Sequence, residues 1–135
     1  MIKGGGGALT REKLVALSSE RGIYVIDESK LVDHLGQSFA VPVEVLPFGW
    51  AVSARRLSEL GCEARLRGGR EKPFVTDNGN YIIDCGFDSP FDSVQVGSAI
   101  KQLPGVIESG LFVGICDVLI VGFEDRVEVR EKARL

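Results

Sequence analysis

The segment between residues 41 and 113 constrains the fold most, because strand-like and helix-like patterns follow one another there in a definite order. Its strands are short alternating or apolar runs, and its helical runs end at glycine or before proline. In chain order, a strand, a helix, two strands, a helix and a strand are expected at residues 41–46, 51–60, 63–67, 81–85, 94–103 and 106–113. This β-α-β-β-α-β order predicts the ferredoxin-like, or split βαβ, arrangement. The Asp-Asn-Gly-Asn sequence at 77–80 predicts a turn between two of these strands.

The segments on either side predict a second unit. A helical pattern over residues 9–21 stops at Gly22, and a short helix is expected at 31–35. Near-continuous apolar runs at 23–26 and 117–121 are typical of a parallel sheet buried on both faces, so they are expected to share one sheet. These segments contain few further short strands, and a complete doubly wound sheet usually has about five or six. We therefore expect them to form about half of such a domain.

The predicted fold class is therefore α/β, with two units. Residues 1–38 and 115–135 would form a partial Rossmann-like domain that lacks its N-terminal half. Residues 39–114 would form an inserted ferredoxin-like α+β lobe.

Charge and hydropathy exclude several classes of partner. The chain has 16 Lys and Arg against 19 Asp and Glu, so an acidic net charge of -3 argues against nucleic acid. No apolar stretch approaches the roughly 18–20 residues of a membrane span, and the glycine-rich start lacks the apolar core of a signal peptide. We therefore predict no nucleic-acid or membrane partner and a cytoplasmic location.

The cysteines do not predict a disulfide framework or a zinc site. Cys62, Cys85 and Cys116 are far apart, form no CxxC motif and have only His34 as a possible histidine partner. We expect three core or half-buried thiols. A Cys–His nucleophile that uses His34 is the alternative.

Five other side chains are candidates for function, each with a structural alternative. Asp27 and Asp117 border predicted buried strands and could face the site, although helix capping or turning of the chain is favoured. Asp77 and Asp84 flank a predicted turn and strand and could form a carboxylate pair, although structural roles are favoured. Trp50 could anchor an interface or pack in the core.

The chemistry is concentrated where four glycines, residues 4–7, stand between Lys3 and a helical segment with Glu12. Consecutive glycines cost backbone entropy, so they need a functional or structural reason. One such reason is the close approach of peptide N–H groups to an anion or a sugar hydroxyl at a helix N-terminus. The loop could fold Lys3 back toward Glu12. A cation, N–H donors and a carboxylate together suit proton abstraction next to a carbonyl. The alternative is a flexible linker with an exposed glutamate, since the pattern matches neither GxGxxG nor Walker A.

Specific motifs carry a family resemblance over residues 2–122. In order they are "IKGGGGALTREKLVA", "DESKLVDHLG", "VPVEVLPFGWAV", "VTDNGNYIID", "LPGVIESGLF" and "DVLIVG". Together they closely resemble the C-terminal part of ribose-5-phosphate isomerases of the A type. The resemblance implies interconversion of ribose 5-phosphate and ribulose 5-phosphate in the non-oxidative pentose phosphate pathway, without metal or organic cofactor. It also implies a Rossmann-like domain with an inserted ferredoxin-like lobe, and a homodimer or homotetramer.

The resemblance implies roles for particular residues. By the KGGGGALxRE motif, Glu12 would be the general base that carries the proton between C1 and C2. The groups that would hold substrate oxygens and the enediolate are Lys3, Gly4, Gly5 and Gly6. By the DESK motif, Lys30 would contact the sugar-phosphate substrate at its phosphate end.

The sequence also departs from the family. The N-terminal half, with its Ser/Thr/Gly-rich phosphate loop and Asp-Gly-Ala-Asp motif, is not in this sequence, and Gly49-Trp50 replaces a Met/Ala-Arg type of sequence. We expect little or no isomerase activity from the chain alone, and a partner that is either an N-terminal-half chain or further copies in a homo-oligomer. The alternative function is a non-catalytic module whose lobe mediates oligomerisation or binds a small molecule.

Overall fold

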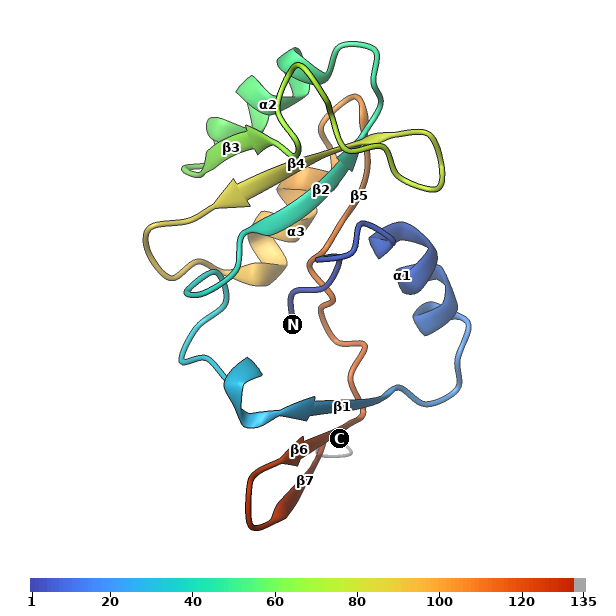
Figure 1. Ribbon diagram of the computed structural model, residues 1–135, viewed down its shortest axis with the longest axis vertical. Helices are drawn as coiled ribbons and strands as arrows, with labels where there is room; N and C mark the ends of the chain where they lie inside the picture. Colours follow the sequence, from blue (N-terminus) through green and yellow to red (C-terminus); the bar gives the residue numbers. More distant parts are fainter. Residues whose placement is uncertain (133–135) are drawn as a thin grey trace.

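The computed structural model describes residues 1–132, which form an α/β fold with one mixed and one antiparallel sheet (Figure 1). In chain order the elements are α1 (Leu9–Leu17), β1 (Ile23–Asp27), the 3-10 helix η1 (Glu28–Lys30), β2 (Val41–Val45), α2 (Trp50–Ser58), β3 (Glu63–Leu66), β4 (Tyr81–Gly86), α3 (Ser93–Lys101), β5 (Val106–Ser109), β6 (Val118–Gly122) and β7 (Val127–Glu131). No helix among these combines the length and apolar composition that crossing a membrane requires.

The antiparallel sheet has the strand order β3-β4-β2-β5. The predicted order of elements from β2 to β5 is confirmed, with ends that differ by one or two residues in most elements. Val43 of β2 is fully buried and belongs to a core that Leu57 of α2 and Ile100 of α3 also enter. Burying each such aliphatic side chain stabilises the fold by about 1.5–3 kcal/mol.

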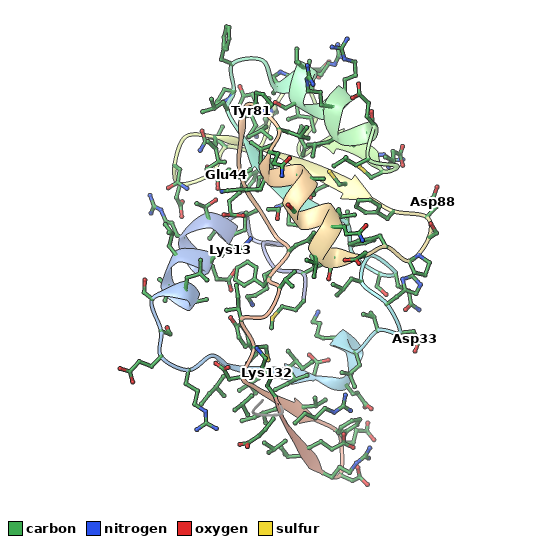
Figure 2. All side chains as sticks on the ribbon, turned by 180° about the vertical axis from the view of Figure 1, so that it is seen from behind. Lys13, Asp33, Glu44, Tyr81, Asp88 and Lys132 are labelled. Carbon is green, nitrogen blue, oxygen red and sulfur yellow. The ribbon has the colours of Figure 1, made fainter. Side chains whose placement is uncertain are left out.

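Helix α1 packs on β2 and β5, so the central strand β2 is covered on both faces. Successive side chains of a strand point to opposite faces, and all five residues of β2 are buried. Pro42 and Glu44 occupy the face toward the glycine loop and α1, where Leu9 is fully buried. Figure 2 shows Glu44 and Lys13 in this region between α1 and the sheet.

The mixed sheet has the order β1-β6-β7, with β1 parallel to β6 and β7 antiparallel to β6. The prediction that residues 23–26 and 117–121 share a sheet is confirmed. The prediction that β1 is buried is wrong, because Ile23 and Val25 are 54% and 72% exposed. The physical reason is the position of α1, which packs against the other sheet (Figure 1).

Three predicted boundaries are wrong. The helix expected over residues 9–21 ends at Leu17, where the hydroxyl groups of Ser18 and Ser19 donate to carbonyls four residues earlier. The helix expected at 31–35 is replaced by η1, because Asp27 caps the backbone N–H of Ser29 just after β1. The strand expected to run to residue 113 ends at residue 109, and the following residues pair with the start of the chain.

Candidate active site around the glycine loop

The backbone of residues 1–3 is held by residues 110–112. The Lys3 N–H donates to the Gly110 carbonyl at 2.8 Å, and the Phe112 N–H donates to the Met1 carbonyl at 2.9 Å. A side chain at residue 110 would collide with the Lys3 carbonyl oxygen and with Pro42, so this approach requires glycine. The first three residues are thus an ordered extension beside β5.

The glycines after Lys3 form a packed turn. Gly4 and Gly7 have φ angles of +100° and +85°, which side-chain-bearing residues rarely adopt. The Gly7 N–H donates to the Gly4 carbonyl at 3.0 Å and closes the turn. A Cβ on Gly4 would lie 2.7 Å from the Cβ of Leu9, the first residue of α1. The turn therefore reverses the chain into α1, and an extended linker is not what these residues form.

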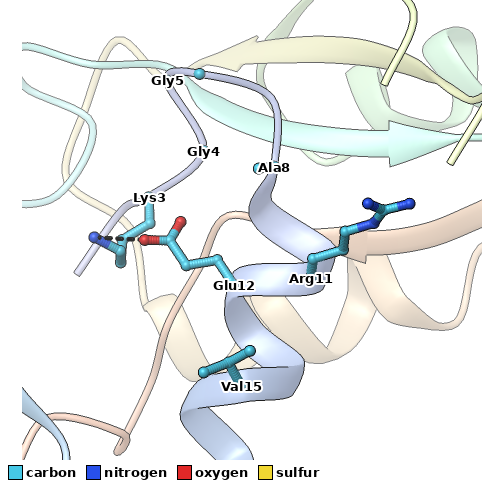
Figure 3. Close-up of a pocket in the computed structure, with 8 residues that line it drawn as sticks. Lys3, Gly4, Gly5, Ala8, Arg11, Glu12 and Val15 are labelled. Carbon is cyan, nitrogen blue, oxygen red and sulfur yellow. Dashed lines mark ion pairs between the residues drawn. The ribbon is translucent and has the colours of Figure 1, made fainter. Parts of the chain in front are cut away.

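This reversal brings Lys3 and Glu12 together. The Lys3 Nζ lies 3.0 Å from Glu12 Oε1, and the two side chains are 28% and 41% exposed. In Figure 3 the Glu12 carboxylate points toward Lys3, whereas Arg11 points away from it. The juxtaposition that the sequence suggested is present in the structure.

The pair lies in a groove of about 610 Å³ at the start of α1. Its lining residues are Lys3, Gly4, Gly5, Gly6, Ala8, Arg11, Glu12 and Val15. Unpaired N–H groups and the helix dipole favour negative charge at such a position. The groove therefore combines an ammonium group, a carboxylate and several peptide groups, which can accept a proton and stabilise an oxyanion.

Lys30 is not brought into this groove. It is the last residue of η1 and is exposed. Its predicted contact with the phosphate end of a substrate stays a prediction.

A buried carboxylate that was not expected from the sequence lies beside the site. Glu44 is fully buried and accepts hydrogen bonds from Thr76 at 2.8 Å, Asn78 at 3.1 Å and Asn80 at 2.8 Å, and also from Thr10. Burial by itself would raise the pKa of the Glu44 carboxyl, but the four hydrogen bonds outweigh it and hold the pKa below its usual value.

Glu44 joins the first turn of α1 to the turn at 76–80. Thr10 lies two residues before Glu12, so this bond fixes the part of the helix that carries the candidate base. The Val-Glu-Val alternation of β2 gave no hint of burial. The available signal was the Thr-Asp-Asn-Gly-Asn segment, a dense set of hydrogen-bond donors that we interpreted only as a turn.

A second interaction that was not expected from the sequence anchors the same face of α1 one turn later. Lys13 is 8% exposed, and its Nζ donates to the Ser109 carbonyl at 2.6 Å and to Glu108 Oε1 at 2.8 Å. Burial would raise the pKa of Glu108, but hydrogen bonds from Lys13, the Ser109 N–H and Lys101 lower it overall. The pair ties α1 to β5 near the segment that holds Lys3.

The four candidate aspartates have structural partners. Asp27 caps η1, and Asp117 accepts a hydrogen bond from the Gly22 N–H at 2.7 Å. Asp77 lies 3.9 Å from Arg11, and Asp84 is paired with an arginine described below. The favoured structural interpretation therefore fits all four.

The thiols and aromatic residues also have packing roles. Cys62 and Cys85 are buried and Cys116 is half-buried, and all three are free, as predicted. Trp50 packs against the core and lies under the Arg70 guanidinium, with 5.6 Å between that group and the ring centroid. Within residues 1–132, no cluster of three or more His, Cys, Asp or Glu side chains could hold a metal ion.

Comparisons with known proteins agree on one family. The family model described as ribose 5-phosphate isomerase A (phosphoriboisomerase A) matches residues 1–126. Ribose-5-phosphate isomerase A of Gloeobacter violaceus is 50% identical over 129 residues, which are 96% of this chain and 56% of that protein. Ribose-5-phosphate isomerase A 1 of Oceanobacillus iheyensis is 45% identical over 130 residues, 96% of this chain and 58% of that protein.

Solved structures give the same result. Ribose 5-phosphate isomerase A from Methanocaldococcus jannaschii superposes with a TM-score of 0.90 at 42% identity, covering 98% of this chain and 59% of that one. A D-ribose-5-phosphate isomerase in complex with phospho-erythronic acid gives a TM-score of 0.92 at 41% identity, covering 98% and 58%. The chain thus spans somewhat more than half the length of the relatives it matches.

Proposed function

The chain belongs to the ribose 5-phosphate isomerase A family, and we propose that it supplies the proton-transferring part of an aldose–ketose isomerase. The reaction is the interconversion of ribose 5-phosphate and ribulose 5-phosphate in the non-oxidative pentose phosphate pathway. The observation that carries the proposal is the 3.0 Å contact between Lys3 and Glu12 in a groove bordered by Gly4–Gly6 peptides.

The chemistry follows from these groups. The Glu12 carboxylate removes the proton from C2 of the aldose, and the C–H electrons form a C1–C2 double bond with negative charge on the C1 oxygen. The Lys3 ammonium and glycine N–H groups stabilise that oxyanion. Protonated Glu12 then delivers the proton to C1. The C2 hydroxyl proton moves to the C1 oxygen, leaving a ketone at C2, so no atoms are gained or lost.

The ion pair between Lys3 and Glu12 can break during this reaction. A partly exposed ion pair contributes only about 0–1 kcal/mol, so Lys3 can leave Glu12 for a substrate oxygen at little cost. A positioned general base contributes about 10²–10⁴-fold in rate. Glu44 and Lys13 support this role because they fix α1 to β2 and to β5.

We assign the phosphate end of the substrate to Lys30. The residue follows the carboxyl end of the parallel strand β1, and ligands of open α/β sheets bind at the carboxyl ends of such strands. One solved relative binds phospho-erythronic acid, a phosphorylated sugar acid. These two facts support a phosphate-binding role.

The division into units is also part of the proposal. Residues 39–114 correspond to a ferredoxin-like lobe, which the strand order β3-β4-β2-β5 supports. Residues 1–38 and 115–135 correspond to a partial Rossmann-like domain, of which 133–135 lie outside the described residues. By its sequence position, helix α1 belongs to the partial Rossmann-like domain, but it packs on the sheet of the ferredoxin-like lobe.

We further propose that α1 docks additional polypeptide. Leu14, Val15 and Leu17 are each more than 60% exposed on a nine-residue helix, and clustered apolar surface marks interaction sites. The occupant we favour is the part of the family's length that lies outside the match, and a homo-oligomer is the alternative. In either case Glu12 lies on a helix whose outer side is an interface.

The test is conversion of ribose 5-phosphate to ribulose 5-phosphate by the chain alone and by the chain mixed with the remaining part of a full-length relative. Turnover that Glu12→Gln abolishes supports the proposal. A well-folded oligomer that neither turns over nor binds the sugar phosphate in either sample would favour the non-catalytic module.

A further inference from the structure

One arginine outside the Lys3–Glu12 groove is joined to the glycine loop. Arg67 follows β3, and Asp84 lies on the adjacent strand β4. The Arg67 Nε donates to Asp84 Oδ2 at 2.9 Å, and Nη2 donates to Oδ1 at 2.6 Å. This bidentate pair is 18% and 27% exposed, and it holds the guanidinium plane in one orientation.

The third nitrogen of the same group faces the glycine loop. Arg67 Nη1 donates to the carbonyl oxygens of Gly4 and Gly5, both at 3.1 Å. One rigid group therefore fixes two consecutive carbonyls of a glycine segment whose backbone has more accessible conformations than that of other residues.

The planarity of the peptide bond makes this contact relevant to the groove. In a trans peptide, the carbonyl of one residue and the N–H of the next point in opposite directions. With the Gly4 and Gly5 carbonyls turned toward Arg67, the N–H groups of Gly5 and Gly6 point away from it. No residue within 1–132 accepts a backbone hydrogen bond from either N–H.

We propose that Arg67, oriented by Asp84, is a positioning residue that aims the Gly5 and Gly6 N–H groups into the groove of Lys3 and Glu12. Arg67 does not line that groove. It lines a neighbouring groove of about 520 Å³ together with Gly5 and Asp84, and so it acts from behind the loop. Lysine cannot replace it, because an ammonium group lacks the planar fork that reaches a carboxylate and two carbonyls at once.

The effect of Arg67 on substrate binding rests on the proposed function, but the positioning of the glycine loop by Arg67 can be measured without substrate. The ¹⁵N relaxation of the Gly5 and Gly6 amides is recorded in the full chain and in Arg67→Met and Arg67→Lys. The matched control is Arg65→Met, since Arg65 stands two residues earlier on β3 and pairs with the exposed Glu63. Order parameters near 0.85 should fall toward about 0.6 in both Arg67 variants and stay high in the control.

A titration with phospho-erythronic acid then tests the consequence. In the parent chain the Gly5 and Gly6 amide signals should shift on binding, and both Arg67 variants should bind about tenfold or more weakly while Arg65→Met binds normally. Unchanged order parameters and unchanged affinity in folded Arg67→Lys would overturn the inference and leave the proposed function standing. Absence of binding by the parent chain would count against the proposed function, and the relaxation data alone would then decide the role of Arg67.

Discussion

The Lys3 ammonium lies 3.0 Å from the Glu12 carboxylate across a turn made entirely of glycine. Since both side chains are partly exposed, replacing Lys3 by Met should change the free energy of unfolding by less than about 1 kcal/mol. It should weaken binding of phospho-erythronic acid by about 10- to 100-fold, because a hydrogen bond to a charged group contributes about 1.5–3 kcal/mol. Calorimetry and urea unfolding measure the two quantities. Lys72→Met in the exposed loop is the control, and equal affinities for all three proteins would contradict the assignment.

The buried Glu44 predicts a specific pH dependence of stability. Its folded-state pKa is depressed, so its contribution is complete above the unfolded pKa of about 4.3 and is lost as the pH falls through the folded value. Glu44→Gln should cost about 1–3 kcal/mol at pH 7, because the amide nitrogen faces donors, and this cost should shrink below about pH 4.

Urea unfolding at pH 7, 4 and 3 measures the cost of Glu44→Gln. The exposed Glu124→Gln serves as the control variant. A cost for Glu44→Gln that is the same at all three pH values would show that its charge does not matter.

The pair of Lys13 and Glu108 should act as a unit. Lys13→Met removes a nearly buried partner and should destabilise the chain by about 3 kcal/mol. The double variant with Glu108→Gln should lose less stability than the two single variants together, because it leaves no unpaired buried charge behind. Chemical denaturation of the four proteins gives the coupling energy, and strict additivity would rule out the interaction as an anchor of α1.

The exposed side of α1 predicts an effect on association alone. Leu14→Ser with Leu17→Ser should weaken binding to the remaining part of a full-length relative by at least about tenfold, because each buried leucine contributes about 1.5–3 kcal/mol. Stability of the isolated chain should be nearly unchanged. Val94→Ser on α3, which is similarly exposed, should leave the association intact. Analytical ultracentrifugation measures both, and undiminished association of the leucine variant would place the interface elsewhere.

Local patterns predicted the strands and helices of residues 41–109 well, because alternation, turn residues and helix stops are encoded in neighbouring positions. They could not reveal which side of a strand is covered. Ile23 and Val25 look like buried strand residues, but their exposure depends on where α1 packs, which is a tertiary property. Glu44 shows the converse error, because alternation places it in water and the structure buries it.

The site was predictable only in part for the same reason. Lys3, the glycines and Glu12 are close in sequence, so chain reversal at the glycines was enough to suggest their meeting. The partners of Glu44 come from segments 32 to 36 residues away, as well as from Thr10. Arg67 reaches the loop over a separation of 62 to 63 residues. Apart from the donor-rich Thr-Asp-Asn-Gly-Asn segment, the sequence carries no local sign of these contacts.

The most direct test of Glu12 as the base measures, by NMR in D₂O, how fast the C2 hydrogen of ribose 5-phosphate exchanges with solvent. The sample is the chain mixed with the remaining part of a full-length relative, with Glu12→Gln and the exposed Glu20→Gln compared in the same way. We predict exchange with the parent chain and with Glu20→Gln, and a loss of about 10²-fold or more with Glu12→Gln. Exchange that survives Glu12→Gln at the parent rate would contradict the account.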